Sequence, residues 1–377
     1  MKLLLGMGVL PTTPLAYADG LVRDAEAMGL HSVMIPDHLM AWFAEAGWAE
    51  VGNIADSLPS PHVFMDPFPA IAAWAAMTSA IRFATAVTDP IRRPPAQLAV
   101  SALSLSHITR GRFILGIGSG EAENCLPYGI PFEQPVARLD EALTIIRRIW
   151  TEGRVTFSGR FWQLRDAVCR LGPYHGRFPE IWIGAHGPRM LELAGRHGDA
   201  WLPFLPMRPE RYAERLAAVR GAAERCGRDP AQLLAGLNTP VFLADSHEQA
   251  HAMIASRAAR QLSLALDQDF YREIDRPHPL GYRHGVTSFI PEWLTEAELL
   301  AALQQTPDPL LAHDLLIHGT PAEVAERLDA YRQAGLQYFA PLDTSPFTDI
   351  RLMPKAASRI CALRSCLQTS PDETCHA

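Results

Sequence analysis

Short apolar runs rich in valine, isoleucine and phenylalanine alternate along the chain with longer segments whose apolar positions recur every three or four residues. The first pattern is typical of buried parallel strands, and the second is typical of helices that cover a sheet. Because the two kinds of segment alternate, the chain is predicted to form an α/β fold, a (β/α)8 barrel. The eight predicted strands cover residues 3–9, 32–35, 82–87, 113–117, 181–184, 200–204, 234–243 and 337–341.

Two helices and their ends are clearly marked. Apolar side chains between Leu139 and Trp150 recur at i, i+3 and i+4 spacing, which predicts one buried helix face. The residues 320–323, Thr-Pro-Ala-Glu, form a capping box with proline at the first helical position, and Gly335 supplies a stop signal. The sequence therefore predicts a helix from Pro321 to just before Gly335.

Three long segments interrupt the alternation and are predicted as insertions after the second, fourth and seventh strands. They cover residues 39–66, 121–135 together with 152–178, and 265–312. We expect a single barrel domain over residues 1–367 and a disordered tail over 368–377.

Composition excludes several classes of function. The chain has 377 residues and a formal net charge of −7, and no run of basic residues marks a nucleic-acid-binding surface. Its lysines are Lys2 and Lys355, near the two ends, so a buried lysine for Schiff-base chemistry and a Gly-Lys-Ser/Thr phosphate loop are both excluded. The six cysteines form no Cys-x-x-Cys pair, and no apolar stretch is long enough to span a membrane. We expect a cytoplasmic protein with reduced thiols.

The ends of the predicted strands carry the candidate chemistry, because barrel enzymes place their active sites at the carboxyl ends of the strands. The second strand ends at Asp37 and His38, with Trp42 shortly after, and the fourth strand leads to Glu121. A histidine, a carboxylate and an indole on one rim could act as acid, base and pocket wall. Each residue alone is more typical of a helix cap or a solvated loop, so their coincidence is what favours a site.

The glycine-rich segments favour an anion site over a dinucleotide fold. A dinucleotide-binding fingerprint starting at Gly116 would need glycine where the chain has Glu121, and Pro127 and Pro131 prevent a helix from following directly. The segment 184–187, Gly-Ala-His-Gly, is the better candidate, because backbone N–H groups at a helix N-terminus can hold a phosphate. A tight turn between strand and helix explains this segment equally well.

Four segments together resemble the luciferase-like superfamily of flavin and deazaflavin oxidoreductases, over essentially the whole chain. They are residues 36–38 with Trp42, residues 85–87, residues 118–121 with Asn124, and residues 181–190. The resemblance is greatest to the branch that uses coenzyme F420. Within that branch the chain is most similar to the phthiodiolone ketoreductase group, on residues 127–129, 135–138, 179–182 and 198–201.

This resemblance implies a barrel of the bacterial luciferase-like type, hydride transfer from reduced F420 to a ketone, and roles for individual residues. His38 and Glu121 would transfer protons and Trp42 would wall the pocket. The Ala86–Val87 bond matches a non-prolyl cis peptide that backs the deazaflavin ring. The other implied cofactor-binding residues are Asp37, Thr88, Asp89, Gly120, Asn124, Gly184, Ala185, His186 and Gly187.

The substrate is expected to be apolar. Where the sugar-phosphate branch of the superfamily has a hydroxyl and a lysine after the sixth strand, this chain has Phe204 and Met207. Together with Phe64, these side chains are expected to line a pocket for a lipid-like carbonyl compound or alcohol. No metal is expected, and a homodimer is implied by the resemblance. Two alternatives stay open: an FMN-dependent monooxygenase and a non-catalytic flavin-binding barrel.

Overall fold

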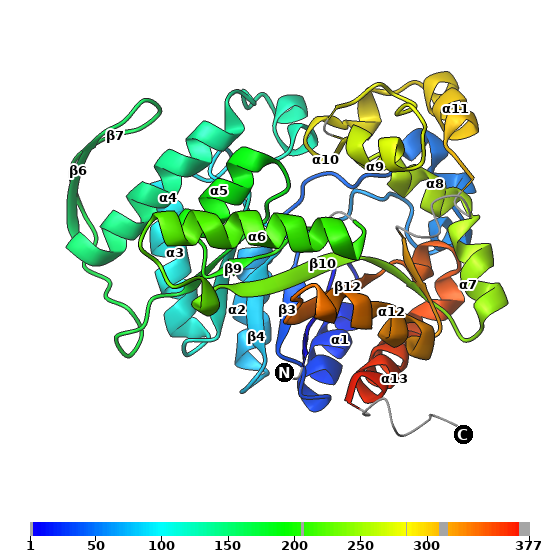
Figure 1. The fold of residues 1–377 in the computed structure, drawn as a ribbon, viewed down its shortest axis with the longest axis horizontal. Helices are drawn as coiled ribbons and strands as arrows, with labels where there is room; N and C mark the ends of the chain where they lie inside the picture. Colours follow the sequence, from blue (N-terminus) through cyan, green and yellow to red (C-terminus); the bar gives the residue numbers. More distant parts are fainter. Residues whose placement is uncertain (1–2, 205–206, 284, 309–315, 369–377) are drawn as a thin grey trace.

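The computed structural model describes residues 3–204, 207–283, 285–308 and 316–368. A ring of parallel strands lies at its centre, with helices around it (Figure 1). In hydrogen-bonded order the strands are β1 (Leu4–Leu5), β12 (Tyr338–Asp343), β10 (Leu234–Leu243), β9 (Ala200–Trp201), β8 (Glu180–Ile183), β5 (Phe113–Ile117), β4 (Arg82–Thr85), β3 (Ser32–Ile35) and β2 (Met7–Gly8). The predicted α/β barrel is confirmed, and each of the eight predicted strands overlaps one of these elements or more. β8 begins one residue before its predicted range, and β12 ends two residues after its predicted range.

The first strand nearly closes the ring, because its two halves pair with opposite neighbours. β1 pairs with β12 and β2 pairs with β3. Between them, the backbone N–H of Gly6 donates to Phe339 O over 2.8 Å. A Cβ atom at Gly6 would lie 2.1 Å from the Tyr338 hydroxyl oxygen and 2.9 Å from Ser32 O. Only glycine therefore lets the chain pass from one neighbour to the other at this point.

Apolar side chains fill both sides of the ring, as expected for parallel strands buried on both faces. One buried cluster includes Met34, Ile114, Trp182 and Tyr338, on four different strands. A much larger cluster joins the strands to the surrounding helices. These helices are α1 (Leu15–Ala27), α2 (Pro67–Ala76), α3 (Pro95–Ile108), α4 (Pro135–Glu152), α5 (Pro188–His197), α6 (Pro209–Arg225), α12 (Pro321–Gln333) and α13 (Ala356–Gln368).

The two clearly marked helices form as predicted. Helix α4 buries its apolar face from Leu139 to Trp150, which places it against the barrel. Helix α12 begins after a capping box in which the Thr320 hydroxyl accepts from Glu323 N and the Glu323 carboxylate accepts from Thr320 N. Gly335 follows its end with φ +101°, a conformation that glycine adopts without strain.

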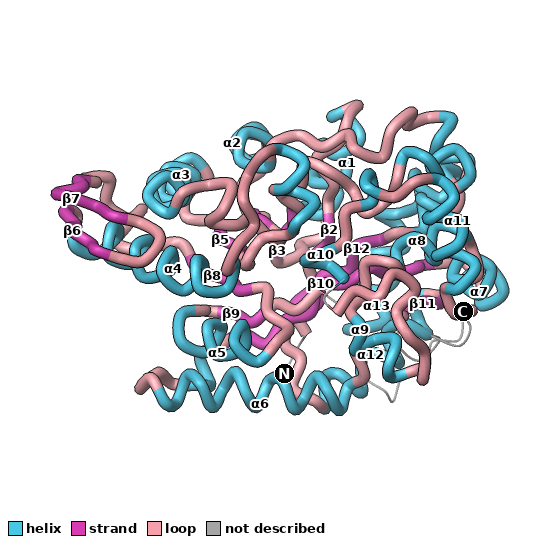
Figure 2. The backbone as a smooth tube through the Cα atoms, turned by 90° about the horizontal axis from the view of Figure 1, so that it is seen from above, coloured by secondary structure: helices cyan, strands magenta, loops and turns pink. Residues whose placement is uncertain are grey.

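Long connections follow three of the strands. After β3 come η1 (Glu45–Glu50) and η2 (Asn53–Asp56), and after β5 come η3 (Ala122–Asn124) and η4 (Leu126–Tyr128). The antiparallel hairpin of β6 (Arg154–Ser158) and β7 (Gln163–Val168) follows α4 and extends away from the barrel (Figures 1 and 2).

Most of the remaining elements follow β10 and lie at one end of the molecule (Figure 1). They are α7 (His247–Ile254), α8 (Arg257–Ser263), α9 (Gln268–Glu273), α10 (Gly285–Ser288), η6 (Pro291–Trp293), α11 (Glu296–Gln305) and β11 (Ile317–Gly319). Three short 3-10 helices lie elsewhere in the chain: η5 (Pro230–Gln232) comes before β10, and η7 (Ser345–Phe347) and η8 (Ile350–Lys355) come after β12. Strand β11 pairs in parallel with β10. The hairpin and β11 were not predicted from the sequence.

Some expectations stay predictions. Residues 309–312 of the third predicted insertion, and all of the predicted tail except Gln368, lie outside the described residues. The single-domain boundary, the homodimer and the cytoplasmic localisation also stay predictions. Among the described helices, none combines the length and apolar character needed to cross a membrane.

Replacing Gly116 by alanine is expected to destabilise the barrel strongly. A Cβ atom at this position would lie 1.7 Å from Thr85 O on the neighbouring strand, so the sheet would have to separate. We expect a loss of at least about 3 kcal/mol in the free energy of unfolding, measured by urea denaturation. Gly20→Ala is the matched control, because a Cβ atom there meets nothing within 4 Å and alanine favours the helix α1. Equal stability of the Gly116→Ala variant and the wild type would contradict this account.

Candidate active site

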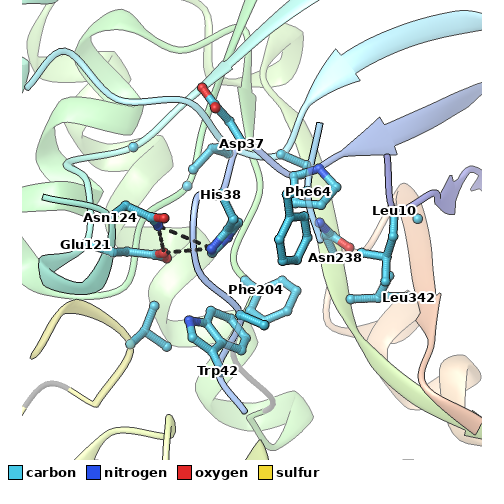
Figure 3. Close-up of a pocket in the computed structure, with 18 of the residues that line it drawn as sticks. Leu10, Asp37, His38, Trp42, Phe64, Glu121, Asn124, Phe204, Asn238 and Leu342 are labelled. Carbon is cyan, nitrogen blue, oxygen red and sulfur yellow. Dashed lines mark hydrogen bonds and ion pairs between the residues drawn. The ribbon is translucent and has the colours of Figure 1, made fainter. Parts of the chain in front are cut away.

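A largely apolar cavity opens at the carboxyl ends of the barrel strands (Figure 3). Its floor comes from residues at or just after the strand ends, and its walls come from the connections after β3 and β10. The lining includes Gly8, Leu10, Met34, Asp37, His38, Trp42, Phe64, Ala86, Val87, Thr88, Asp89, Arg92, Gly118, Gly120, Glu121, Asn124, Gly184, His186, Leu202, Phe204, Asn238, Leu262, Val286, Leu342 and Phe347. The predicted strand-end residues thus meet in one cavity.

One wall of the cavity carries a compact polar cluster (Figure 3). His38 Nδ1 lies 3.6 Å from Glu121 Oε2 and 3.5 Å from Glu123 Oε1. The Asn124 side-chain Nδ2 lies 3.2 Å from both His38 Nδ1 and Glu121 Oε2, and 3.3 Å from Glu123 Oε1. The Trp42 indole N–H donates to Glu123 Oε1 over 2.9 Å. Histidine, tryptophan and carboxylate therefore come together as the sequence predicted.

Glu123 is the member of this cluster that sequence reasoning missed. Its side chain has no exposed surface, whereas that of Glu121 is 19% exposed. It lies in η3, between the two predicted site residues Glu121 and Asn124. A second carboxylate directly after a buried strand, flanked by two candidate site residues, was the signal that could have identified it.

Burial raises the pKa of both glutamates. For Glu121 the loss of solvation and the negative charge of Glu123 raise the pKa well above the usual range, against a smaller opposing effect of His38. For Glu123, burial raises the pKa to about 7, although hydrogen bonds to Glu121 and Trp42 oppose it. Two carboxyl groups this close cannot both ionise easily, so they titrate as a pair. The cluster can therefore hold a proton at neutral pH.

A separate ion-pair network holds the rim in place. The buried Asp37 carboxylate accepts from the Thr88 hydroxyl over 2.6 Å, from Arg93 Nε over 2.9 Å and from Arg92 Nη1 over 3.3 Å. Arg92 Nε also donates to Asp89 Oδ2 over 2.6 Å. Burial alone would raise the pKa of Asp37, but the two guanidinium groups and the hydroxyl bring it below the usual range. Both aspartates line the cavity, yet their carboxylates are engaged by protein groups.

The Ala86–Val87 peptide bond is cis, as the resemblance implies, and Gly118 makes room for Val87, whereas Gly184 would accept a side chain at ordinary contact distance. A Cβ atom at Gly118 would lie 2.8 Å from Val87 Cγ2, and one at Gly184 would lie 3.5 Å from either Val87 methyl carbon. Gly120 adopts φ +87° beside Asp89. Close packing around Val87 and a left-handed turn thus explain the glycines at 118 and 120 without a dinucleotide fingerprint.

The predicted anion-binding segment divides into lining and non-lining residues. Gly184 and His186 line the cavity, whereas Ala185 is buried behind it and Gly187 forms the N-cap of α5. Burial, with a smaller contribution from Arg215, lowers the pKa of His186 to about 3, so this imidazole is neutral. Its Nε2 accepts from Phe204 N over 3.3 Å, which leaves the hydrogen on Nδ1. That buried Nδ1 has no protein partner.

The predicted substrate pocket is present in part. Phe204 and Phe64 line the cavity, and their rings lie near Trp42 and His38, with centroids 5.2 and 5.8 Å apart respectively. Met207 does not line it, which corrects that assignment. Met207 lies two residues before α6 and packs in the large core cluster, and its carbonyl oxygen accepts from the Tyr331 hydroxyl.

The expectation that no metal is bound stays a prediction. Two groups of residues in the chain are of types that can bind a metal ion. His38, Glu121 and Glu123 each offer a ligand atom within 4.8 Å of the others, so their geometry would admit an ion. The residues 247–251 also form a His-Glu-x-x-His sequence on α7, which that expectation overlooked. In the described part of the chain, these two histidines are not part of a comparable group of three ligand atoms, and His247 Nδ1 lies 2.8 Å from Glu323 Oε1.

Comparison with known proteins places the chain in a family. Residues 4–338 match the luciferase-like monooxygenase family model. The chain belongs to this family. It is 37% identical to a phthiodiolone/phenolphthiodiolone dimycocerosates ketoreductase of Mycobacterium sp. (strain JLS), over 82% of each chain. It is also 30% identical to an F420-dependent glucose-6-phosphate dehydrogenase of Kineococcus radiotolerans, over 85% of this chain and 86% of the relative.

Solved structures share the fold of this luciferase-like chain at lower identity. An F420-dependent secondary alcohol dehydrogenase in complex with an F420-acetone adduct matches with a TM-score of 0.75 and 20% identity, over 96% of this chain and 99% of that one. The oxygenating constituent of 3,6-diketocamphane monooxygenase from Pseudomonas putida, in complex with FMN, matches with a TM-score of 0.65 and 18% identity, over 97% and 98%. At these identities the likeness establishes the barrel fold alone.

Replacing Asp37 by asparagine is expected to destabilise the luciferase-like barrel by about 2 kcal/mol at pH 7, because Arg92 and Arg93 lose the buried carboxylate that both of them bind. Each guanidinium then keeps a single acidic partner, Asp89 and Asp66 respectively. The pKa of Asp37 is lowered in the folded state, so its ion pairs stabilise the fold above the ordinary pKa of about 3.9. That contribution is lost as the pH falls through the folded-state pKa. The stability difference between wild type and variant, measured by urea denaturation from pH 7 to pH 3, should therefore shrink only at the acid end.

Asp140→Asn is the control for this measurement. Asp140 pairs with Arg196 at a site where both side chains are more than one third exposed. Exposed pairs contribute less than about 1 kcal/mol, so its effect should be small at every pH. Equal losses for the two variants would show that Asp37 has no special structural role.

Proposed function

We propose that this chain is a coenzyme F420-dependent oxidoreductase of the ketoreductase type. It would transfer a hydride between the deazaflavin and the carbonyl or alcohol carbon of an apolar, lipid-like substrate. The observation that supports this most is the asymmetry of the cavity, in which one cluster of proton-carrying groups faces otherwise apolar walls. The relatives named as ketoreductase and as F420-dependent dehydrogenase support the same class of chemistry.

The residues at the cavity floor fit a polar heteroaromatic cofactor. His186 Nδ1 and Asn238 Oδ1 are buried polar atoms without protein partners, and both residues line the cavity. A ring system that carries both N–H and carbonyl groups would satisfy one donor and one acceptor of this kind. The predicted residues that line the cavity and are proposed to hold it are Asp37, Ala86, Val87, Thr88, Asp89, Gly120, Asn124, Gly184 and His186. Ala185 and Gly187 do not line the cavity and are not included.

When bound, reduced F420 supplies the hydride that adds to the carbonyl carbon. Negative charge then develops on the substrate oxygen, and a proton must reach that oxygen. His38 is the proposed donor, because its imidazole can give a proton from one ring nitrogen and take one up at the other, and it lines the cavity beside the glutamate pair. Trp42 would hold the apolar side of the substrate and keep water away from His38.

A binding and single-turnover experiment tests this proposal. The purified protein should quench or polarise the fluorescence of F420 at micromolar concentration or below and should not bind FMN or FAD. His38→Ala should leave F420 binding unchanged and slow single-turnover hydride transfer by about 10²–10⁴-fold. His107→Ala is the matched control, because that histidine bonds to Gly172 O at the surface and does not line the cavity. Binding of FMN alone would instead favour a luciferase-like monooxygenase.

The cavity walls support the apolar substrate class. A second, smaller cavity adjoins the first and shares Trp42, Phe204, Pro240 and Leu262 with it. Its other lining residues are apolar except Ser263. The Trp42–Phe204 ring pair therefore separates two apolar spaces, and an alkyl chain that enters the first cavity points toward the second when Phe204 moves.

Rates with a series of aliphatic methyl ketones test whether the Trp42–Phe204 ring pair limits the length of the substrate. In the wild type, kcat/KM should rise with each added methylene, by about 0.8 kcal/mol of binding energy, until the first cavity is full. Phe204→Ala should extend that rise to longer chains, because it joins the two cavities. Phe178→Ala, which removes a ring stacked on Trp150 outside the cavity, is the control and should keep the wild-type profile. A Phe204→Ala profile that matches the wild type would refute the shared wall.

A further inference from the structure

We propose that Glu121 and Glu123 share one proton, and that Glu123 is a positioning residue that keeps this proton available to His38. The role in turnover rests on the proposed function, whereas the shared proton does not. Three independent features of the cluster carry the inference: the number of hydrogens available to it, the charges that face it, and the route that links it to the cavity.

The hydrogens supplied by Asn124 are too few for the acceptors around it. Its Oδ1 accepts from the backbone N–H groups of Leu39 over 2.7 Å and Met40 over 3.4 Å, which fixes the amide with Nδ2 toward the cluster. That nitrogen carries two hydrogens but lies within 3.2–3.3 Å of three acceptors, on His38, Glu121 and Glu123. The Trp42 indole N–H serves Glu123 Oε1 as well, so these three acceptors can each receive a hydrogen. The buried Glu123 Oε2 stays without a hydrogen-bond partner unless the cluster holds a proton of its own.

The charges that face the pair do not neutralise two carboxylates. Arg92, from the connection after β4, is the nearby guanidinium, and it already pairs with Asp37 and Asp89. The other titratable groups that face the glutamates are His38 from the connection after β3, and Cys125 and Tyr128 next to η3. Helix α10, which also packs on η3, consists of Gly-Val-Thr-Ser and brings no charged side chain.

Burial adds to the cost of a second negative charge. The Glu123 side chain has no exposed surface, and its Oε2 has no hydrogen-bond partner. An ionised carboxylate in that position, beside a second one, is costly without a cation. Retaining one proton on the pair is therefore the stable arrangement at neutral pH, and the raised pKa of both glutamates agrees with it.

His38 connects the pair to the substrate. In its neutral form, Nδ1 accepts from Asn124 Nδ2, so the ring hydrogen is on Nε2. In ketone reduction, the carbonyl carbon gains the hydride, and the Nε2–H bond breaks as an O–H bond forms on the substrate oxygen. At the same time the carboxyl O–H bond of the pair breaks as an N–H bond forms at His38 Nδ1, so the imidazole stays neutral. The starting state returns when His38 Nε2 takes up a proton from solvent and Nδ1 gives its proton back to the pair, and alcohol oxidation runs the same steps in reverse.

The pH dependence of turnover tests the role of Glu123. In Glu123→Gln the neighbouring charge that raises the pKa of Glu121 is gone, so Glu121 loses its proton at lower pH. The basic limb of kcat/KM for ketone reduction should move toward acid by about one pH unit or more, a loss of about tenfold on that limb. Glutamine can still accept from the Trp42 indole, so the fold of the loop is retained. Glu123→Asp restores a second carboxylate and should return the basic limb of kcat/KM to its wild-type pH.

Glu180→Gln is the matched control. Glu180 also accepts from an indole N–H, that of Trp182 over 2.9 Å, but it lies at the start of β8, outside the cavity lining. Its pH profile should match the wild type. An unshifted basic limb in Glu123→Gln would overturn the positioning role, as would a shift of the same size in Glu180→Gln.

An infrared titration tests the shared proton without cofactor or substrate. Protein labelled with ¹³C-glutamate should show the C=O stretch of one protonated glutamate at pH 7, and both Glu121→Gln and Glu123→Gln should abolish it. A wild-type spectrum without this band overturns the proposal. If the band is present but F420 does not bind, the shared proton stands and the proposed function fails. If Glu123→Gln does not fold, the Glu121→Gln and Glu123→Asp spectra decide the same question.

Discussion

The placement of His38 depends on the ionised carboxylate of Asp37. Asp37 lies two residues after the end of β3, and its side chain binds Thr88, Arg92 and Arg93 from the segment that follows β4. Arg92 Nη2 also donates to the backbone carbonyl of Asp37 over 2.6 Å, so side chain and main chain are both fixed. Since His38 is the next residue, the ion pairs set where its ring can lie. The charged part of the rim thus supports the fold, and proton chemistry is left to a separate cluster.

Trp42 joins the proton-carrying cluster to the apolar walls. Its indole N–H holds Glu123, while its ring lies against His38 and Phe204, with centroids 5.7 and 5.2 Å away. A movement of the connection after β3 therefore changes the acid cluster and the apolar wall together. Under the proposed function, a substitution at Trp42 would therefore affect both the binding of an alkyl chain and the delivery of a proton.

Features that depend on local pattern could be predicted from the sequence, and features that depend on distant contacts could not. The eight strands and the helices α4 and α12 follow from periodicity and capping signals over a few residues. Strand β11 is three residues long and exists because it pairs with β10. In the β6–β7 hairpin few residues are buried, so no regular apolar pattern marks its strands.

The site divides in the same way. Barrel topology brings strand ends together, so His38 and Glu121 could be identified before any geometry was known, whereas Asn124 was implied by the resemblance to the luciferase-like superfamily. The direction in which a side chain points after the end of a strand could not be predicted, because it depends on where the backbone turns. Met207 faces the core for that reason, and Glu123, two residues after Glu121 in a 3-10 turn, comes back to the same cluster.

The electrostatics of the cavity are consistent with the apolar substrate that we propose. Among the described residues that line it, Arg92 is the guanidinium, and two carboxylates already bind it. His186 is neutral, because burial lowers its pKa to about 3. A phosphate group on a substrate would therefore enter without an uncommitted positive charge to offset its loss of solvation. An apolar carbonyl compound meets no such penalty, since its polar atom can lie at the proton-carrying wall while its alkyl part contacts aromatic and aliphatic side chains.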